Sequence, residues 1–274
     1  MAMESATEIN PAIRHRIESE LDAVEAQHGV RVLFACESGS RAWGFASPDS
    51  DYDVRFIYVH RPEWYFHVVP PRDVIELPIT DELDINGWEL RKALFLLRKG
   101  NAALNEWLRS PVIYRAEPVF TQAFRDAMET CYQPERAFHH YLHMALGNYR
   151  EFLQRDQVRL KKYLYVLRPL LAALWIEREK TMPPMRFLDL VDALVTDTVL
   201  RATIDDLLAR KRRSPESRYG SPIPRLDMFL DAELQRLRDS PPPPQQRPDF
   251  SVLDRLLFDT VTRMPAYNGC PEKE

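Results

Sequence analysis

The chain has 274 residues, of which 45% are hydrophobic and 28% are charged, and its formal net charge is −4. This balance is typical of a folded globular protein of one large or two ordinary domains, and it argues against a surface that coats nucleic acid along its whole length. Three widely spaced cysteines argue against a disulfide framework or a zinc site. Since no apolar run reaches about 18 residues and the N-terminal stretch lacks the apolar core of a signal peptide, we expect a cytoplasmic protein without a membrane span.

The first part of the chain alternates helical and strand patterns. Apolar residues at intervals of three and four between Asn10 and His28 predict a helix that covers a sheet. Short apolar runs at Val32–Cys36 and Val54–Val59 predict buried strands. The further elements expected in this part are a short helix, two strands and two helices, at Pro62–Phe66, Val74–Leu77, Leu83–Ile85, Trp88–Arg98 and Asn101–Arg109. From about residue 116 onward the strand patterns vanish.

Between the first two predicted strands lies a motif that combines an anion site with a metal site. Gly39 and Ser40 open a short helix, where glycine allows close backbone approach and the N–H groups of the helix start attract an anion. Asp51 and Asp53 begin the second strand, and because residues two apart point to the same face of a strand, their carboxylates project together. Such oxygen ligands suit Mg²⁺, which fills its other positions with water and phosphate oxygens. The motif therefore predicts metal-assisted nucleotide chemistry.

A third carboxylate is expected at Asp84. It lies between two apolar residues on a predicted buried strand, where an acid is costly unless it is paired or bound to a metal. Asp81 and Glu82 are the competing choices, in a more polar connection. Arg41, next to the Gly-Ser turn, has two open interpretations, which are contact with a phosphate and pairing with a surface acid.

The second half of the chain is predicted to be helical. A leucine stripe at intervals of three and four runs from Leu160 to Leu174. Lys161, Tyr165 and Arg168 share another face of this helix, and two cations with an aromatic ring suit the phosphates and base of a nucleotide. An ordinary polar face is the alternative. Pro169 is expected to kink this helix or to begin a new one.

The segments nearer the C-terminus carry a basic run and a proline run. Residues 209–221 begin with ARKRR and are expected to form an exposed basic loop, either solvated or in contact with an RNA backbone. Pro241–Pro244 predicts a polyproline linker. Helices are expected on both sides of this linker, at Leu226–Leu237 and at Phe250–Phe258, and the last of them is expected to pack back on the protein.

The stretch GSRAWGFASPDSDYDVRFIY resembles the signature of the DNA polymerase β-like nucleotidyltransferase superfamily, in which Gly-Ser is followed by Asp-x-Asp. The complete stretch resembles one branch of this superfamily, the predicted nucleotidyltransferases associated with RNA ligases and RNA repair (the RlaP/YcgL-like group). Three downstream stretches resemble the same branch: LDINGWELRKALFLL, NAALNEWLRSP and KKYLYVLRPLLAALW. The resemblance covers roughly Val32 to Trp175. It places the third acid of the superfamily at Asp84 and favours a nucleotide-binding role for the helix face that carries Lys161. The resemblance indicates the class of reaction more specifically than it indicates the substrate.

We therefore predict an α+β protein. A nucleotidyltransferase domain with a small mixed sheet, like the palm of polymerase β, is expected at residues 1–115, and an all-helical domain at residues 116–274, with the active site in the cleft between them. The resemblance implies that the three aspartates Asp51, Asp53 and Asp84 bind two Mg²⁺ ions, with Mn²⁺ as an alternative. It also implies an NTP substrate whose triphosphate contacts the turn residues Gly39, Ser40 and Arg41.

The expected reaction moves an NMP from the NTP to an acceptor hydroxyl, and three outcomes remain open. The resemblance implies an RNA end in a repair pathway, with a functional link to an RNA ligase. Transfer to a protein hydroxyl or to a small molecule requires the same catalytic centre. An antitoxin-like nucleotidyltransferase that modifies a partner protein is an enzyme of this kind. A non-catalytic nucleotide-binding or interaction module is the alternative from another class, and the intact Asp-x-Asp argues against it.

Overall fold

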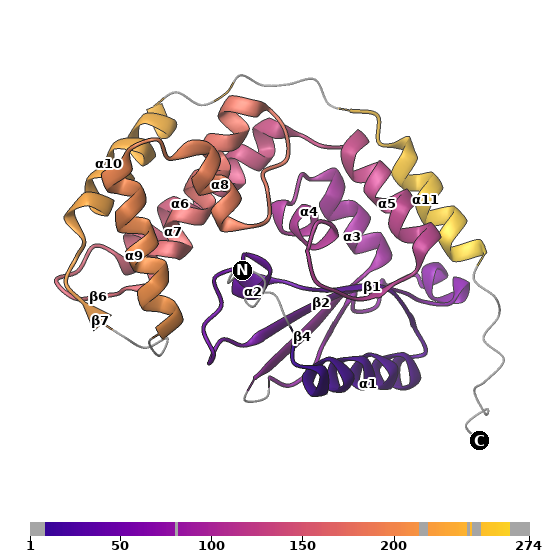
Figure 1. Ribbon diagram of the computed structural model, residues 1–274. Coiled ribbons are helices and arrows are strands. Elements are labelled where there is room, and N and C mark those ends of the chain that lie inside the picture. Colours follow the sequence, from indigo (N-terminus) through magenta and orange to yellow (C-terminus); the bar gives the residue numbers. More distant parts are fainter. Residues whose placement is uncertain (1–8, 80–81, 214–218, 240–241, 243–247, 264–274) are drawn as a thin grey trace.

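A five-stranded sheet forms the centre of the first of two packed units (Figure 1). The computed structural model describes residues 9–79, 82–213, 219–239, 242 and 248–263. The strands lie in the order β3-β4-β2-β1-β5, and their bounds are Arg31–Glu37 (β1), Tyr52–Val59 (β2), Val74–Glu76 (β3), Leu83–Glu89 (β4) and Ile113–Ala116 (β5). β2 and β4 pair in parallel and the other neighbours pair antiparallel, so the predicted mixed sheet of an α+β fold is confirmed.

Helices cover both faces of this sheet because its strands alternate their buried side chains between two apolar clusters. On one face α1 (Pro11–His28) packs Ile17, Leu21 and Val24 against Val54 and Phe56 of β2. The opposite face carries the helices Leu90–Arg98 (α3), Ala102–Leu108 (α4), Pro118–Thr130 (α5) and Ser251–Thr262 (α11) (Figure 1). Two short helices lie in the loops of the unit, Gly39–Ala42 (α2) and the 3-10 helix Pro62–Phe66 (η1).

The second unit is helical and follows α5 in the chain. Its helices are Pro134–Phe152 (α6), Lys161–Glu179 (α7), Phe187–Leu194 (α8), Thr198–Arg213 (α9) and Pro224–Asp239 (α10). Two short strands, Val158–Arg159 (β6) and Tyr219–Gly220 (β7), pair beside them. The apolar core of this unit also takes in Phe45 and Ala102 from the first unit, so the two units pack directly on each other.

Pro169 lies inside α7, and the helix continues through it. A proline at this position deprives the carbonyl of Tyr165, four residues earlier, of its helical donor. The side-chain amide of Asn148 on α6 donates to that carbonyl over 3.0 Å. The neighbouring helix thus supplies the missing hydrogen bond, and the prediction that a new helix begins at Pro169 is wrong, whereas a kink there stays a prediction.

The packing divides the chain differently from the predicted boundary between residues 115 and 116. That boundary falls within β5, and α5 packs on the sheet together with α11, which returns from the end of the chain. The ARKRR run is also placed differently, because it ends α9 and Lys211 is buried, so an exposed loop is wrong for residues 209–213. Residues 214–218, with 241, 243 and 244 of the proline run, lie outside the described part of the chain.

Candidate active site

The Gly-Ser turn is packed directly on the first residues of β2. Gly39 has a φ of +60°, a left-handed conformation that residues with a side chain rarely adopt. A Cβ atom at this position would lie 2.1 Å from Oδ2 of Asp53. The backbone N–H of Ser38 also donates to the carbonyl of Asp53 over 2.8 Å. Glycine is therefore required here by both the backbone angle and the carboxylate that lies against it.

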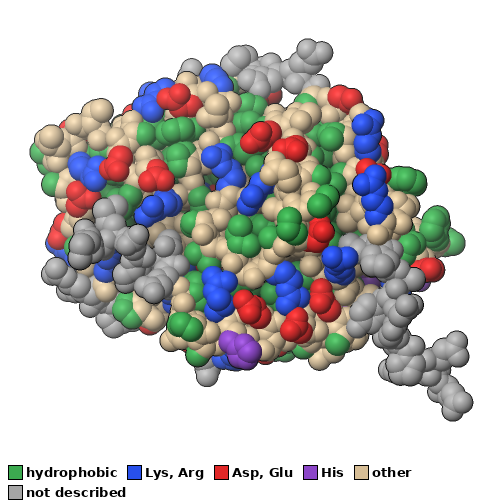
Figure 2. Space-filling model, turned by 45° about the vertical axis from the view of Figure 1, so that its right-hand side comes forward, with side chains coloured by type: hydrophobic (Ala, Val, Ile, Leu, Met, Phe, Trp, Pro, Cys, Tyr) green, Lys and Arg blue, Asp and Glu red, His purple; other side chains and the backbone are tan. Residues whose placement is uncertain are grey.

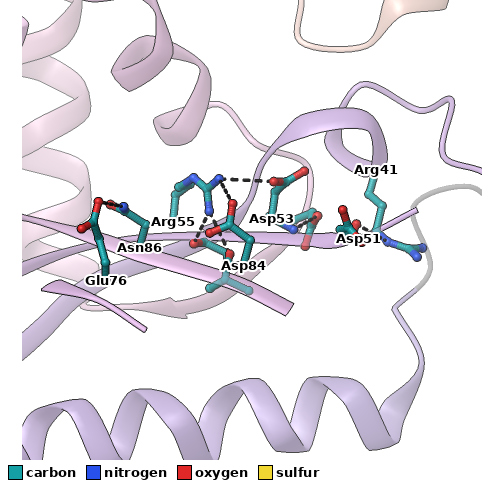
Figure 3. Close-up of polar contacts among 9 residues, drawn as sticks. Arg41, Asp51, Asp53, Arg55, Glu76, Asp84 and Asn86 are labelled. Carbon is teal, nitrogen blue, oxygen red and sulfur yellow. Dashed lines mark hydrogen bonds and ion pairs between the residues drawn. The ribbon is translucent and has the colours of Figure 1, made fainter. Parts of the chain in front are cut away.

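Asp53 and Asp84 are direct neighbours across the parallel pair of β2 and β4. In Figure 3 Asp51, Asp53 and Asp84 lie in a row at the starts of these strands, with Arg55 beside Asp53 and Asp84. Asp51 is exposed, whereas the side chains of Asp53 and Asp84 are 29% and 33% exposed. Glu82 pairs with Arg16 at the surface instead, and the other competing acid, Asp81, lies outside the described residues.

Arg55 joins the two neighbouring aspartates. Its Nη2 lies 3.2 Å from Oδ1 of Asp53 and 2.8 Å from Oδ2 of Asp84. Its Nη1 donates to the carbonyls of Val54, over 3.0 Å, and of Asp84, over 2.8 Å. Arg55 was not predicted as a site residue, although its position two residues after Asp53 on the same strand puts it on the same face.

Glu37 at the end of β1 is a second site residue that the sequence analysis missed. It is fully buried, and its Oε1 accepts from the backbone N–H of Asp53 over 3.0 Å, while its Oε2 accepts from the hydroxyl of Tyr114 over 2.5 Å. Burial raises the pKa of the Glu37 carboxyl to about 7. The carboxyl fixes the backbone that carries Asp53, and its sequence signal was an acid at the end of a buried apolar run.

Arg41 and Ser40 turn inward rather than toward open solvent. Both are buried, and the guanidinium of Arg41 donates to the carbonyl of Ser50 over 2.6 Å and to that of Asp51 over 3.2 Å. It also lies 3.7 Å from the centre of the Tyr52 ring. In this structure Arg41 therefore holds the loop before Asp51, and pairing with a surface acid, one of its two interpretations, is wrong.

Arg168 does not belong to an exposed polar face. Its side chain is 2% exposed and forms an ion pair with Glu106 of α4, which also accepts from the hydroxyl of Tyr141 over 2.6 Å. Since α7 packs here on the first unit, this position lies in the contact between the units. The prediction that Arg168 lines an open cleft is therefore wrong.

Tyr165 packs on aromatic residues that follow the Gly-Ser turn. The Tyr165 ring packs edge-on against Trp43, with ring centres 5.9 Å apart, and is 6.4 Å from Phe45. Lys161 begins α7 and is half-buried. Tyr165 is thus separated from the Gly-Ser turn by one aromatic layer, and nucleotide binding by Tyr165 and Lys161 stays a prediction.

The donor chemistry of the aspartates fits Mg²⁺ in one particular way. Among the residues that the structure describes, no group of three or more His, Cys, Asp or Glu side chains converges as a metal site. Mg²⁺ is commonly bound, however, by one or two carboxylates together with water and substrate phosphates. Asp51 and Asp53 fit an ion of this kind, which shares its ligands with a triphosphate.

A mixed sheet that places a Gly-Ser turn against an Asp-x-Asp strand defines the polymerase β-like nucleotidyltransferase class. The family described as "RlaP: RNA repair pathway DNA polymerase beta family" matches residues 13–259, and the chain belongs to this family. It is 45% identical to the protein YcgL of Bacillus subtilis (strain 168) over 251 residues. These aligned residues make up 91% of this chain and 96% of YcgL.

A solved nucleotidyltransferase-like protein from Exiguobacterium sibiricum 255-15 is similar over 91% of this chain and 81% of that chain. The sequence identity is 11% and the TM-score is 0.30, so this likeness supports no conclusion. Within the described part of the chain, none of the helices has both the length and the apolar character that crossing a membrane requires.

Proposed function

We propose that the protein is a divalent-metal-dependent nucleotidyltransferase that moves an NMP from an NTP to an acceptor hydroxyl. The observation that carries this proposal is the contact of Gly39 with the carboxylate of Asp53, which is itself paired in register with Asp84. An anion-binding turn and a row of carboxylates are the two halves that nucleotidyl transfer needs. Arg41 and Glu37 support this arrangement by fixing the loop and the backbone on either side.

The reaction assigns a role to each residue of the row. Asp51 and Asp53, with Asp84 beside them, are the residues that would hold Mg²⁺, which supplies charge neutralisation for the triphosphate and for the attacking oxygen. Gly39 has no side chain and therefore leaves room for the carboxylate of Asp53 directly against the anion-binding turn. The acceptor oxygen forms a bond to the α-phosphorus, the bond from this phosphorus to the bridging oxygen breaks, and pyrophosphate leaves. The proton of the acceptor hydroxyl passes to a carboxylate of the site.

A groove on the helical unit supports an RNA end as the acceptor. It has a volume of about 210 Å³ and is lined in part by Phe152, Arg159, Lys162 and Tyr219. The ammonium of Lys162 lies 3.7 Å from the centre of the Phe152 ring, and Nε of Arg159 donates to the hydroxyl of Tyr219 over 2.8 Å. Alternating cations and aromatic rings suit the backbone and bases of a single strand.

Two further observations support the same acceptor. Lys162 also lies 5.1 Å from the ring centre of Tyr165, which packs on Trp43, three residues after Ser40 of the Gly-Ser turn. On the face in view in Figure 2 the charge is mixed, with Lys and Arg interspersed with Asp and Glu. A local groove therefore fits RNA better than a general basic surface does. The family description, which names an RNA repair pathway, agrees with this acceptor.

The test is transfer of label from each α-labelled NTP, with Mg²⁺ and a pool of RNA, to RNA or to protein. Label on RNA is expected. Label on protein would favour a protein-modifying nucleotidyltransferase, and label on neither would favour a non-catalytic module. The double variant R159A/K162A should reduce RNA labelling about tenfold or more without a change in NTP binding. Arg238 is exposed and lies on α10, so R238A is the control that should label RNA like the wild type.

A further inference from the structure

Three segments that are far apart in the sequence meet in one buried cluster between the two units. Trp43 directly follows α2, Glu106 lies on α4 and Arg168 lies on α7. The carboxylate of Glu106 forms an ion pair with Arg168, and their side chains are 12% and 2% exposed. Oε2 of this carboxylate accepts from Nε1 of Trp43 over 3.2 Å, and the Arg168 guanidinium lies 5.0 Å from the centre of the Trp43 ring. Since a buried charge is costly without its partner, the ion pair holds the indole in one position.

The main chain of Trp43 connects this cluster with the Gly-Ser turn. Its N–H donates to the carbonyl of Gly39 over 3.0 Å, which closes the single turn of α2. Its carbonyl accepts from the N–H of Phe187, the first residue of α8, over 2.9 Å. Two residues further on, Phe45 is buried in the core of the helical unit, and its N–H donates to the carbonyl of Ser40 over 3.0 Å. The helical unit therefore holds the segment after the turn by side chains and by main chain.

We infer that Trp43 is a positioning residue for the proposed nucleotidyl transfer. It fixes the Gly-Ser turn against Asp53, and the ion pair of Glu106 and Arg168 fixes Trp43 in turn. The inference rests on the proposed function, which places the triphosphate at this turn. The contact is close, because a Cβ atom on Gly39 would lie 2.1 Å from Oδ2 of Asp53. A small movement of Trp43 therefore changes how the turn fits both the carboxylate and the phosphates.

The experiment measures the KM for the NTP in the transfer assay. It also measures, by calorimetry, the affinity for an NTP analogue whose α,β-bridge is a methylene group. W43F removes the indole N–H and keeps an aromatic ring. It should raise the KM for the NTP about tenfold and weaken analogue binding by a similar factor. The kcat and the KM for RNA should hardly change, because the turn contacts the triphosphate both before and during the reaction.

Trp175 provides a matched control. It lies on α7, is half-buried like Trp43, and its Nε1 donates to the hydroxyl of Thr181 over 3.1 Å. W175F thus makes the same chemical change and loses the same type of hydrogen bond, but within the helical unit. It should keep the KM and the analogue affinity of the wild type.

E106Q separates positioning from a general loss of structure. Arg168 and the hydroxyl of Tyr141 both donate to Oε1 of Glu106, so the single oxygen of a glutamine stays on their side. Its amide group then faces Nε1 of Trp43, where two donors meet, and E106Q should also raise the KM for the NTP about tenfold. If both changes act through this one contact, W43F/E106Q should raise the KM about tenfold as well, whereas independent effects would multiply to about 100-fold.

A KM like that of the wild type in a folded W43F or a folded E106Q would overturn the inference and leave the proposed function intact. An increase of about 100-fold in the double variant would do the same. A wild type that neither transfers an NMP nor binds the analogue would overturn both.

Discussion

Replacement of Gly39 by alanine tests whether Asp53 must lie against the Gly-Ser turn. The new Cβ would be 2.1 Å from Oδ2 of Asp53 and 2.9 Å from its Cγ, and heavy atoms do not approach a Cβ closer than 3.0 Å. The difference of 3.0 and 2.1 Å requires the carboxylate to move by about 1 Å, and a displacement of this size in a catalytic group costs roughly 100-fold in rate. We therefore expect G39A to lose about 100-fold in kcat/KM for transfer.

The backbone strain of this substitution has its own control. Gly29 ends α1 with a φ of +61°, and a Cβ there would meet nothing within 4 Å. G29A thus carries the same left-handed strain, roughly 1–2 kcal/mol, without the contact. At about 2–4 °C in Tm per kcal/mol for a chain of this size, both variants should lose about 2–8 °C.

The assay compares the two variants at a temperature where both are folded, by initial transfer rates and by thermal unfolding. G29A should keep nearly all of the activity of the wild type. If G39A were as active as G29A, the contact between Gly39 and Asp53 would have no part in catalysis, and the placement of the centre would be refuted.

The double variant D51N/D53N should abolish transfer with little change in Tm, because Asp51 is exposed and Arg55 keeps its contacts with Asp84 and two carbonyls when the partly exposed pair with Asp53 is lost; full activity would remove both aspartates from the centre. E106A should cost about 3–5 kcal/mol in urea unfolding, because Arg168 is left buried without its carboxylate partner, whereas E106Q/R168M should recover most of this loss. A loss below about 1 kcal/mol in E106A would contradict the importance of this pair. Since the folded pKa of Glu37 is raised from 4.5 to about 7, the folded state holds its proton more tightly. Its contribution to stability is therefore full below pH 4.5 and is lost as the pH rises through about 7, and E37Q should lack this slope. An identical slope in E37Q would assign it to another group.

The part of the candidate site that depends on spacing along the chain could be predicted from the sequence. Residues two apart on a strand must share a face, so Asp51 and Asp53 were found from spacing alone. Asp84 was found as an acid within an apolar run, and the parallel register that sets it beside Asp53 came only with the structure. Their catalytic roles stay predictions.

What the sequence did not yield depends on contacts between distant segments. The contact of Arg55 with Asp84 exists only because β2 and β4 are paired. The contact of Glu37 with Tyr114 likewise exists only because β5 lies beside β1. Arg168 follows the period of a polar helix face, yet Glu106, 62 residues earlier, makes its burial tolerable. Periodicity reports which residues share a face of a helix, but it does not report what covers that face.

The order of packing along the chain makes the helical unit an insertion. α6 to α10 lie between α5 and α11, both of which fill one cluster on the sheet, where Leu253 and Leu256 join Phe120 and Phe124. A chain cut after α5 would therefore leave an uncovered apolar surface, so the sheet unit cannot be isolated by removing everything beyond it. The chain also passes between the units twice, before α6 and after α10. Two covalent connections therefore tie the helical unit to the sheet unit.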